Sequence, residues 1–424
     1  MAMQSLHNPA RPSALRPMRK RRSVLLVGVS SVAAAAMLLF APQQARAQVA
    51  ATGRAFEADP SAITGNVSLT RTDIEDIVRI TSPEAVITWD PVDTAMGGGP
   101  INILPQNNTL VFTGDAPFIV LNRVIPTDQS RAIQFNGNVI TSIGGSIGVG
   151  GTVWFYSPGG IIAGPTSRFF VRSLVLSTSE LAGIDKNGTE LNFLGARSDS
   201  AIDIRRGAAI LAGDYVVLWS PRIQQGGVIA AGLQSGGNVS LVGAESGVLS
   251  VTGGLFDMTI NIGTDDPNGV VHTGTTTGAT PVDGLNRAIT LATISKNDFV
   301  NMLVGGNVGY ANASAANISN GIVRLTAGSG AQPASGNITI SPANFTSTTL
   351  AQASGDLTIA LSGIGSNLTV GSATNEADFI GVAADQLTVS ATNGASVLAF
   401  DDFAVGAAVP GQGGTVSIVV DDAG

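Results

Sequence analysis

The sequence has 424 residues, of which 53 are glycine, 12% are charged and none is cysteine. A chain with so few charges and 44% hydrophobic residues is not disordered, because disorder needs high net charge and low hydrophobicity. Glycine without a Gly-X-Y period excludes collagen, and the lack of cysteine excludes disulfides and zinc sites of His and Cys ligands. The composition therefore predicts an all-β protein that uses glycine at its corners and grows by stacking repeats.

Residues 1–47 have the three parts of a cleaved signal peptide. Six basic residues and no acidic one precede an apolar run from Val24 to Ala41, and Ala45-Arg46-Ala47 supplies a small-x-small cleavage pattern. We therefore expect cleavage after Ala47 and export through the periplasm. No later stretch is long and apolar enough to be a transmembrane helix, so the mature chain should have no integral membrane segment.

Removal of the signal peptide makes the chain strongly acidic. It leaves 15 Lys and Arg against 30 Asp and Glu, a formal net charge of −15, and no basic residue follows Arg324. Because phosphate binding needs a basic face, nucleic acid is excluded as a partner.

From residue 48 onward, short apolar–polar alternations predict strands. Thr72 and Glu75 have the spacing of a capping box, so a short helix could begin there, but Ile77–Ile80 fits a strand and we favour the strand. Further strands are predicted at Gly65–Leu69, Asn102–Leu104, Thr109–Thr113, Phe118–Leu121, Ile133–Phe135, Val139–Ile143, Val153–Tyr156 and Phe169–Leu176.

Residues Ser157, Pro158, Gly159 and Gly160 predict a tight turn. Pro158 presets one backbone dihedral, and the glycines accept positive φ. An apolar pair that begins at Ile161 then restarts a strand at once. A strand, a tight corner and another strand, repeated along the chain, are typical of a β-solenoid.

From about residue 200 the strands become regularly spaced. They are predicted at Ile202–Ile204, Ala209–Leu211, Tyr215–Ser220, Gly227–Ala230, Asn238–Val242 and Val248–Val251. The last four begin about eleven residues apart, so about two strands should fill each coil of twenty-odd residues.

A five-residue word recurs along the chain: a turn residue, a polar residue, an apolar residue, a hydroxyl residue and an apolar residue. It occurs at Gly65–Leu69, Gly237–Leu241, Gly336–Ile340, Gly355–Ile359, Ser366–Val370, Asp385–Val389 and Gly414–Ile418. In a strand, its two apolar side chains would point inward and its hydroxyl outward. Stacked coils would then form apolar ladders inside and hydroxyl ladders outside.

Residues 256–320 interrupt this rhythm and are predicted to be an insertion or irregular loop on the side of the solenoid. Within them, Ser295–Leu303 could form a short helix with a Ser cap. Residues 321–424 return to Gly-, Thr- and Asn-rich repeats and end without an evident cap, which indicates a frayed last coil or a fragment of a longer protein. The expected domains are therefore 1–47, 48–255, 256–320 and 321–424.

No catalytic, cofactor or metal site is predicted. His272 is the single histidine after Ala47, and we interpret it as an exposed loop residue without function. The adjacent acids Asp265-Asp266, Asp401-Asp402 and Asp421-Asp422 would face opposite ways in a strand, and we interpret them as solvated turn residues.

Two groups of motifs, in order along the chain, resemble the secretion domain of the two-partner secretion family of filamentous haemagglutinin-like exoproteins. The first group is Asn122-Arg123-Val124, the segment Gly151–Ile161 with its Ser157-Pro158-Gly159-Gly160 turn, and Ser173–Thr178; the second is Tyr215–Gly232 and Gly237–Ala244. In the family's turn, Asn stands at the positions of Ser157 and Gly159. Because glycine also tolerates positive φ, we expect the corner to survive the second change.

The resemblance covers about residues 50–255 and implies a right-handed parallel β-helix. It also implies that a partner outer-membrane β-barrel transporter recognises this region. Asn122–Val124 and the turn Ser157–Gly160 would be the motif residues. The exoprotein would cross the outer membrane extended and fold outside, coil upon coil.

We therefore predict a non-enzymatic exoprotein of a Gram-negative bacterium, secreted or at the cell surface. It would be an adhesin or biofilm component that contacts host or neighbouring cells. One alternative is a β-helical polysaccharide lyase or hydrolase, which needs clustered carboxylates with Arg or Lys on one face of the solenoid. Others are the delivery stalk of a contact-dependent toxin and an autotransporter passenger, although the latter's C-terminal barrel pattern is lacking.

Overall fold

A computed structural model of the chain describes residues 53–93, 98–148, 150–185, 188–232, 237–252, 255–278, 287–296, 299–304 and 306–310, and then 321–327, 335–340, 348–350, 356–362, 367–370, 380–382, 386–392, 395–399, 403–405 and 415–421. Within them lie strands β1 to β36 and no α-helix, which confirms the predicted all-β class. Among the described residues, no helix is long and apolar enough to cross a membrane.

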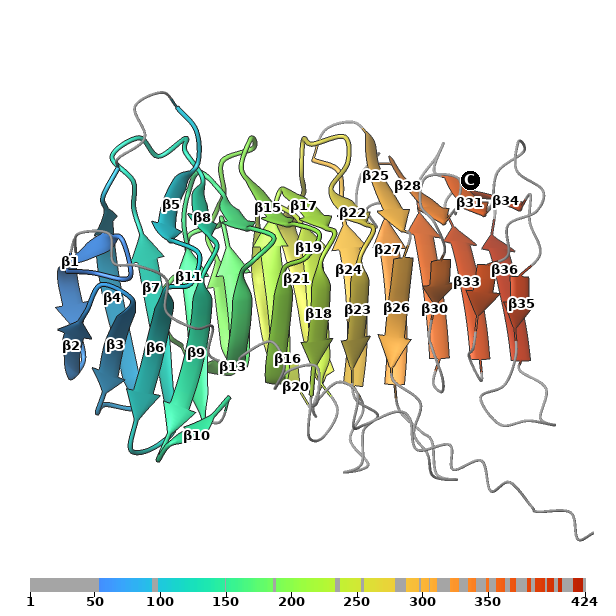
Figure 1. Ribbon diagram of the computed structural model, residues 1–424. Helices are drawn as coiled ribbons and strands as arrows, with labels where there is room; N and C mark the ends of the chain where they lie inside the picture. Colours follow the sequence, from blue (N-terminus) through green and yellow to red (C-terminus); the bar gives the residue numbers. More distant parts are fainter. Residues whose placement is uncertain are drawn as a thin grey trace, which may run out of the picture.

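Most strands belong to three ladders of parallel strands, which run side by side along an elongated stack (Figure 1). The chain passes through ladder 1, ladder 2 and ladder 3 in turn, and this passage makes one coil. Each strand then pairs in parallel with the strands one coil before and one coil after, so the sheet hydrogen bonds join distant segments of the sequence.

The ladders comprise the following strands. Ladder 1 is β5 (Ile101–Leu104), β8 (Ile133–Phe135), β12 (Ile161–Ala163), β15 (Ala201–Ile204), β17 (Arg222–Gln225), β22 (Val270–His272), β25 (Phe299–Val304), β28 (Ser335–Ile340), β31 (Asn367–Val370) and β34 (Ser396–Ala399). Ladder 2 is β3 (Glu75–Ile80), β6 (Thr109–Gly114), β9 (Asn138–Ile143), β18 (Val228–Ala231), β23 (Thr275–Gly278), β26 (Gly306–Tyr310), β29 (Thr348–Leu350), β32 (Ile380–Val382) and β35 (Phe403–Val405). Ladder 3 is β4 (Glu84–Pro91), β7 (Phe118–Val124), β11 (Gly151–Tyr156), β19 (Asn238–Gly243), β24 (Arg287–Thr293), β27 (Gly321–Ala327), β30 (Asp356–Ser362), β33 (Gln386–Thr392) and β36 (Thr415–Asp421). The long strands β13 (Arg168–Ser177) and β16 (Ala209–Ser220) belong to ladders 2 and 3.

Antiparallel strands cover the N-terminal end of the stack. Strand β1 (Ala58–Thr64) pairs with β4, and β2 (Val67–Arg71) pairs with β3. Arg71 bonds the buried carboxylate of Asp76 at 2.8 Å and donates to the carbonyls of Phe56 and Ala58 at 2.7 and 2.6 Å. The first coil is thereby closed by polar bonds, since it has no preceding coil on which to pack.

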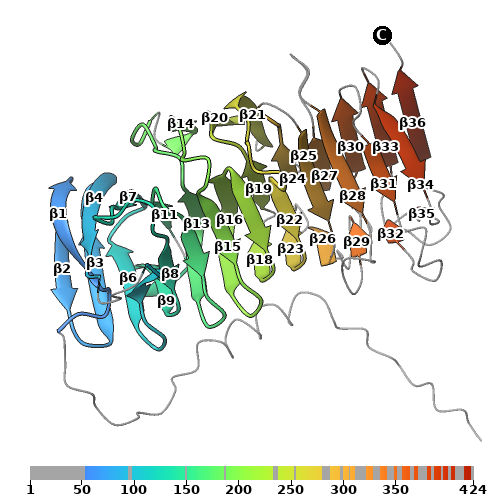
Figure 2. The same cartoon turned by 90° about the horizontal axis from the view of Figure 1, so that it is seen from above.

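A second antiparallel sheet lies outside ladder 3. It consists of β14 (Glu190–Phe193), β20 (Ser246–Thr252) and β21 (Leu255–Ile262), and we call it the side sheet (Figure 2). A short β10 (Ser146–Ile147) folds back on β9.

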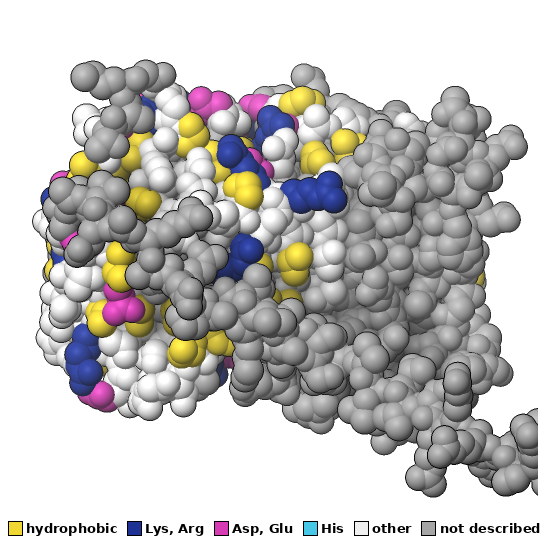
Figure 3. Space-filling model, in the orientation of Figure 1, with side chains coloured by type: hydrophobic (Ala, Val, Ile, Leu, Met, Phe, Trp, Pro, Cys, Tyr) yellow, Lys and Arg dark blue, Asp and Glu magenta, His cyan; other side chains and the backbone are white. Residues whose placement is uncertain are grey.

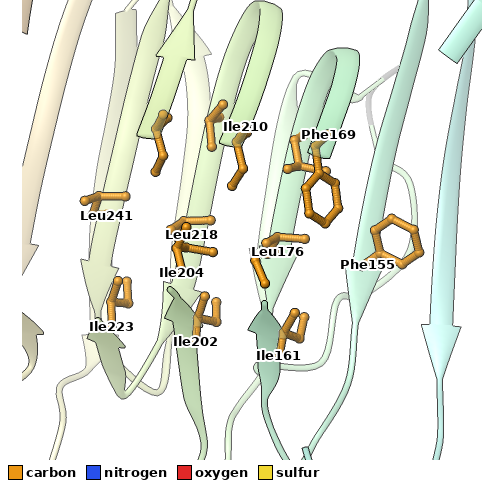
Figure 4. Close-up of a cluster of buried hydrophobic side chains, with 14 of the residues drawn as sticks. Phe155, Ile161, Phe169, Leu176, Ile202, Ile204, Ile210, Leu218, Ile223 and Leu241 are labelled. Carbon is orange, nitrogen blue, oxygen red and sulfur yellow. The ribbon is translucent and has the colours of Figure 1, made fainter. Parts of the chain in front are cut away.

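The interior of the coils is a continuous apolar core. Phe155, Leu176, Leu218 and Leu241 point inward from ladder 3, and Ile161, Ile202 and Ile223 point inward from ladder 1 (Figure 4). Phe135 lies between the rings of Phe155 and Phe169, with ring centroids 5.0 and 5.4 Å away. Full burial of each such side chain contributes about 1.5–3 kcal/mol, so each coil depends on its neighbours for stability.

The five-residue words stack on one another in register. In ladder 3, Leu357 pairs with Leu387 and Thr358 pairs with Thr388. Val416 and Ser417 of β36 pair with Leu387 and Thr388 in turn. In ladder 1, Ile338 pairs with Leu368. Leu387, Val389, Ile359 and Leu368 are buried, whereas Thr358 and Thr388 are only partly buried. The predicted inner apolar row and outer hydroxyl row are confirmed for β30 and β33, where Ile359 and Val389 pair and are both buried; in the last strand, β36, Val416 and Ile418 are exposed.

The number of strands in a coil differs from the prediction. Three ladders, not two strands, make a coil. Tyr215 pairs with Asn238, so the coil that joins them has the predicted length of twenty-odd residues. Arg287 pairs with Gly321, so the coil that joins these two residues is longer. The predicted strand Val248–Val251 belongs to β20 of the side sheet and not to a coil. Ladder 1 strands were predicted at Asn102–Leu104, Ile133–Phe135 and Ile202–Ile204, but β17 was not, because a run of four residues gives little periodicity.

The region 256–320 holds more regular structure than predicted. Strand β21 does lie on the side of the stack, but β22 to β26 continue all three ladders. The predicted helix Ser295–Leu303 is wrong, since Phe299–Val304 is strand β25, paired with β22 and β28. Register with its neighbours overrides the local cap signal of Ser295. At Thr72 the cap signal serves a turn instead, in which Thr72 Oγ1 accepts a bond from the Glu75 amide at 2.9 Å.

Candidate functional site

The segments that carry the resemblance include consecutive strands of ladder 3, and they extend into β12 and β17 of ladder 1 and β18 of ladder 2. The strands in ladder 3 are β7, β11, β13, β16 and β19, which stack in this order (Figure 1). Asn122 pairs with Phe155, Phe155 with Leu176, Leu176 with Leu218, and Leu218 with Leu241. Motifs that are far apart in the sequence therefore make one continuous sheet.

Asn122 points into the core of the stack and is fully buried. Its Oδ1 accepts a hydrogen bond from Trp89 Nε1 at 3.0 Å, and its Nδ2 donates to the Trp154 carbonyl at 3.2 Å. These partners belong to the preceding and the following coil, so one side chain bridges three coils. Val124 also points inward and is fully buried.

Arg123 is the motif residue that reaches the outer surface. It forms an ion pair with Glu180 at 2.6 Å, and the two side chains are 36% and 30% exposed. Tyr156, its register partner, hydrogen-bonds Glu180. Burial, followed by the negative charge of Glu180, raises the pKa of Tyr156 above its ordinary value. Arg123, Tyr156 and Glu180 together link β7 and β11 to the segment that follows β13.

The turn Ser157–Gly160 is built on the backbone of the preceding coil. A Cβ atom on Gly159 would lie 2.6 Å from the carbonyl carbon of Arg131 and 2.7 Å from its nitrogen. The positive φ, +127°, belongs to Gly160. The expectation that Gly159 supplies the tolerance of positive φ is therefore wrong: Gly159 is needed for close approach and Gly160 for conformation.

Buried polar groups close the corner beside this turn. The Ser157 amide donates to the Ser177 carbonyl at 3.1 Å, and the Gly160 carbonyl accepts from the Ile133 amide at 3.0 Å. Thr178 Oγ1 donates to Ser220 Oγ at 2.9 Å. Ser157, Pro158 and Gly160 are all buried, so the corner offers little side-chain surface to a partner.

The side sheet buries the outer face of the same strands. Leu121, Trp154, Val175, Trp219 and Val242 point outward from ladder 3 and pack under Leu191, Phe193, Leu249 and Phe256. The rings of Phe193 and Trp219 stack with centroids 4.1 Å apart. The side sheet is not among the features predicted from the sequence. The signal was present, because β11 and β16 are apolar at consecutive positions, as strands buried on both faces are.

The enzyme alternative requires carboxylates with a cation on one face, and one such cluster exists. Lys296 Nζ lies 2.9 Å from Glu245 and 3.5 Å from Asp265, while Arg222 lies 3.9 Å from Asp266. The hydrogen bond to Glu245 raises the pKa of Lys296, so this amine stays charged and is a poor base. Within the described residues, no group of three or more His, Asp or Glu could hold a metal ion.

Other predicted residues lie elsewhere. His272 is not an exposed loop residue: it lies in β22 and is fully buried. Its neighbours Thr273 and Gly274 obscured the alternation that places Val270 and His272 on one inward face. Ala47 and the pair Asp401-Asp402 lie outside the described residues.

On the face in Figure 3, charged side chains are scattered among uncharged ones in the coloured part of the surface.

No protein-family model matches the sequence, and no curated protein matches it. The structure is similar to the secretion domain of HMW1 from Haemophilus influenzae, with a TM-score of 0.43 and 16% identity over 85% of this chain and 100% of that chain. It is also similar to the filamentous hemagglutinin secretion domain, with a TM-score of 0.41 and 12% identity over 85% of this chain and 99% of that chain. The solved structures to which the chain is similar thus include two secretion domains of two-partner secretion.

Proposed function

We propose that the chain is a secreted or surface-exposed exoprotein whose region 48–255 is recognised by a partner outer-membrane β-barrel transporter. One observation carries the proposal: the segments that resemble the secretion motifs occur in order along the chain and contribute five consecutive strands of ladder 3, β7, β11, β13, β16 and β19. Because each coil brings the next strand beside the previous one, these segments also follow one another in the extended chain, which is the form in which a transporter would read them.

The burial of these segments supports recognition before folding. Asn122 and Val124 are enclosed by the core, and the outer face of ladder 3 is enclosed by the side sheet. A transporter could reach few of these side chains in the folded stack. It would read them in the extended chain, and closure of each coil on the previous one would then draw the chain outward.

The remaining expectations belong to the same proposal. Residues 1–47 are removed after Ala47, the stack is a right-handed parallel β-helix, and residues 321–424 extend it away from the recognised region. The hydroxyl rows of these last coils present a weakly charged surface, which suits an adhesin or biofilm component directed at host or neighbouring cells. The chain has no catalytic role in this proposal.

Export assays in cells with and without the partner transporter test the proposal. We expect Asn122→Leu to accumulate in the periplasm while the wild type is released. A matched control, Ile359→Ala, weakens the core of β30 without touching the motif strands and should still be exported. Release of the wild type without the transporter, or equal retention of both variants, would contradict specific recognition.

A further inference from the structure

The side sheet is held on the stack by side chains and not by backbone pairing. Its three strands form a sheet of their own, and in the described residues none of them pairs with a ladder strand. Leu249 and Phe256 on its inner face belong to the cluster around Trp219. Asp257 on its other face is exposed. Because this cluster is separate from the core inside the coils, the side sheet can lift without breaking a ladder.

The attachments of the β20–β21 hairpin lie at its two ends. The Ala244 amide, before β20, donates to the last carbonyl of β16 at 3.0 Å, and the Thr264 amide, after β21, donates to the Ile294 carbonyl at 2.8 Å. Beside the first attachment, Glu245 accepts from Lys296 Nζ at 2.9 Å. These bonds fix where the hairpin leaves and rejoins the stack, so its ends are hinge points and the strands between them are the part that moves.

One buried donor favours opening of the side sheet. Trp219 is fully buried under it, and its indole N–H finds no hydrogen-bond acceptor within the described structure. A buried donor without an acceptor destabilises the closed arrangement, because water would bond it if the side sheet lifted. On the opposite face of ladder 3, the indole N–H of Trp89 donates to Asn122 Oδ1 at 3.0 Å. One indole is therefore satisfied inside the coils, and the other gains a partner on opening.

Gly247 lets the side sheet sit directly on that indole. A Cβ atom at this position would lie 2.7 and 2.8 Å from Trp219 Cη2 and Cζ2. From β14, the ring of Phe193 stacks on the same indole with centroids 4.1 Å apart. Because Gly247 has no positive φ, a methyl group there would act through contact alone, with Trp219 and with the Thr259 carbonyl, and would hold the side sheet off the indole.

The order of the chain makes the side sheet the last part of the motif region to assemble. Strand β14 follows β13, but its pairing partner β20 comes after β19. Phe193 likewise has to wait for Trp219 of β16. If the chain folds as it emerges from its N-terminus, β7, β11, β13, β16 and β19 have therefore paired before the side sheet covers them.

We propose that the side sheet is a lid on ladder 3. It opens and closes as a unit over Trp154 and Trp219 while the ladders remain stacked. It closes after the motif strands have paired. One part of the inference rests on the proposed function: when the chain is exported, closure of the lid locks the paired strands outside the transporter.

Hydrogen exchange of the indole N–H groups in D2O tests the lid in the full folded chain. The chain has three tryptophans, so their indole signals can be followed separately by NMR and assigned with Trp89→Phe and Trp219→Phe. We expect the Trp219 hydrogen to exchange at least about a hundredfold faster than that of Trp89, which needs unfolding of the coils. Dilute urea should accelerate the exchange of Trp89 more steeply, because unfolding exposes more surface than lid opening. Equal rates, or the same urea dependence for both, would overturn the lid.

Gly247→Ala tests the contact of the lid with Trp219. It should accelerate the exchange of Trp219 about tenfold and leave that of Trp89 unchanged. Gly195→Ala, whose methyl group meets no atom within 4 Å, is the matched control and should change neither rate. Equal acceleration of both indoles would show that the lid and the coils open together, which contradicts the proposal. If Gly247→Ala does not fold, the wild-type rates decide.

The role of the lid in export has a separate readout. With the partner transporter present, Gly247→Ala should be released more slowly than Gly195→Ala, and equal release of the two would refute this role. The exchange measurements need no transporter, so the lid and the recognition of Asn122 can fail independently of each other.

Discussion

Trp89 donates its indole N–H to Asn122 Oδ1 at 3.0 Å, so two consecutive strands of ladder 3 are joined inside the core. Asn122→Leu keeps the volume but leaves that N–H unpaired. We expect a loss of about 1–3 kcal/mol in the free energy of unfolding, measured with urea. Asn261→Ala, on the exposed face of β21, is the matched control and should change it by less than about 0.5 kcal/mol. Equal effects would show that the interior bonds of Asn122 contribute nothing.

The two glycines of the turn should respond to alanine for different reasons. Gly159→Ala pushes a methyl group into the Arg131 backbone, and Gly160→Ala forces alanine into a φ of +127°. Each should cost about 1–3 kcal/mol. Gly195 has no atom within 4 Å of its would-be Cβ and no positive φ, so Gly195→Ala should be neutral or slightly stabilising. Thermal unfolding of the three variants measures these differences in stability. If Gly159→Ala did not lower the stability, the close approach of Gly159 to the Arg131 backbone would be contradicted.

Local alternation was sufficient to predict most strands and the stacking of the repeated words. Ile359 and Val389 pair in register and are both buried because both words alternate in the same way, which is visible in the sequence. The partner of a strand is not visible there. Val248–Val251 alternates like a coil strand, yet it pairs antiparallel with β14 and β21. Whether a strand joins a coil or covers one depends on contacts that are distant in sequence.

The candidate site was predictable as a set of segments but not as a geometry. The residues around Asn122 and Ser157 were found through resemblance, whereas the burial of Asn122 depends on Trp89 in another coil. The role of Gly159 depends on Arg131, which lies one coil earlier. His272 was misinterpreted because its strand is three residues long and Thr- and Gly-rich residues follow it.

Tyr215 should make the stack sensitive to alkali. Burial raises its pKa to about 12. Its folded pKa thus exceeds the value of about 10 in an unfolded chain, so its contribution is full below pH 10 and is lost between about pH 10 and 12. The loss should be about 1–3 kcal/mol. Tyr215→Phe should flatten that part of the stability curve and remove one late step from the phenolate absorbance titration. A step near pH 10 that disappears in Tyr215→Phe would contradict the burial.

The cluster of Glu245, Asp265 and Lys296 is expected to be a clamp between coils and not an acid–base pair. Lys296→Met leaves Glu245 without its cation, which should lower the free energy of unfolding by about 1 kcal/mol, and less at high salt because Lys296 is partly exposed. Adding Glu245→Gln should restore part of the loss, since the amide is not a stranded charge. Urea unfolding at low and high salt measures this double-mutant cycle. Cleavage of a polysaccharide by the wild type, lost in Glu245→Gln at unchanged stability, would contradict the structural role and favour the enzyme alternative.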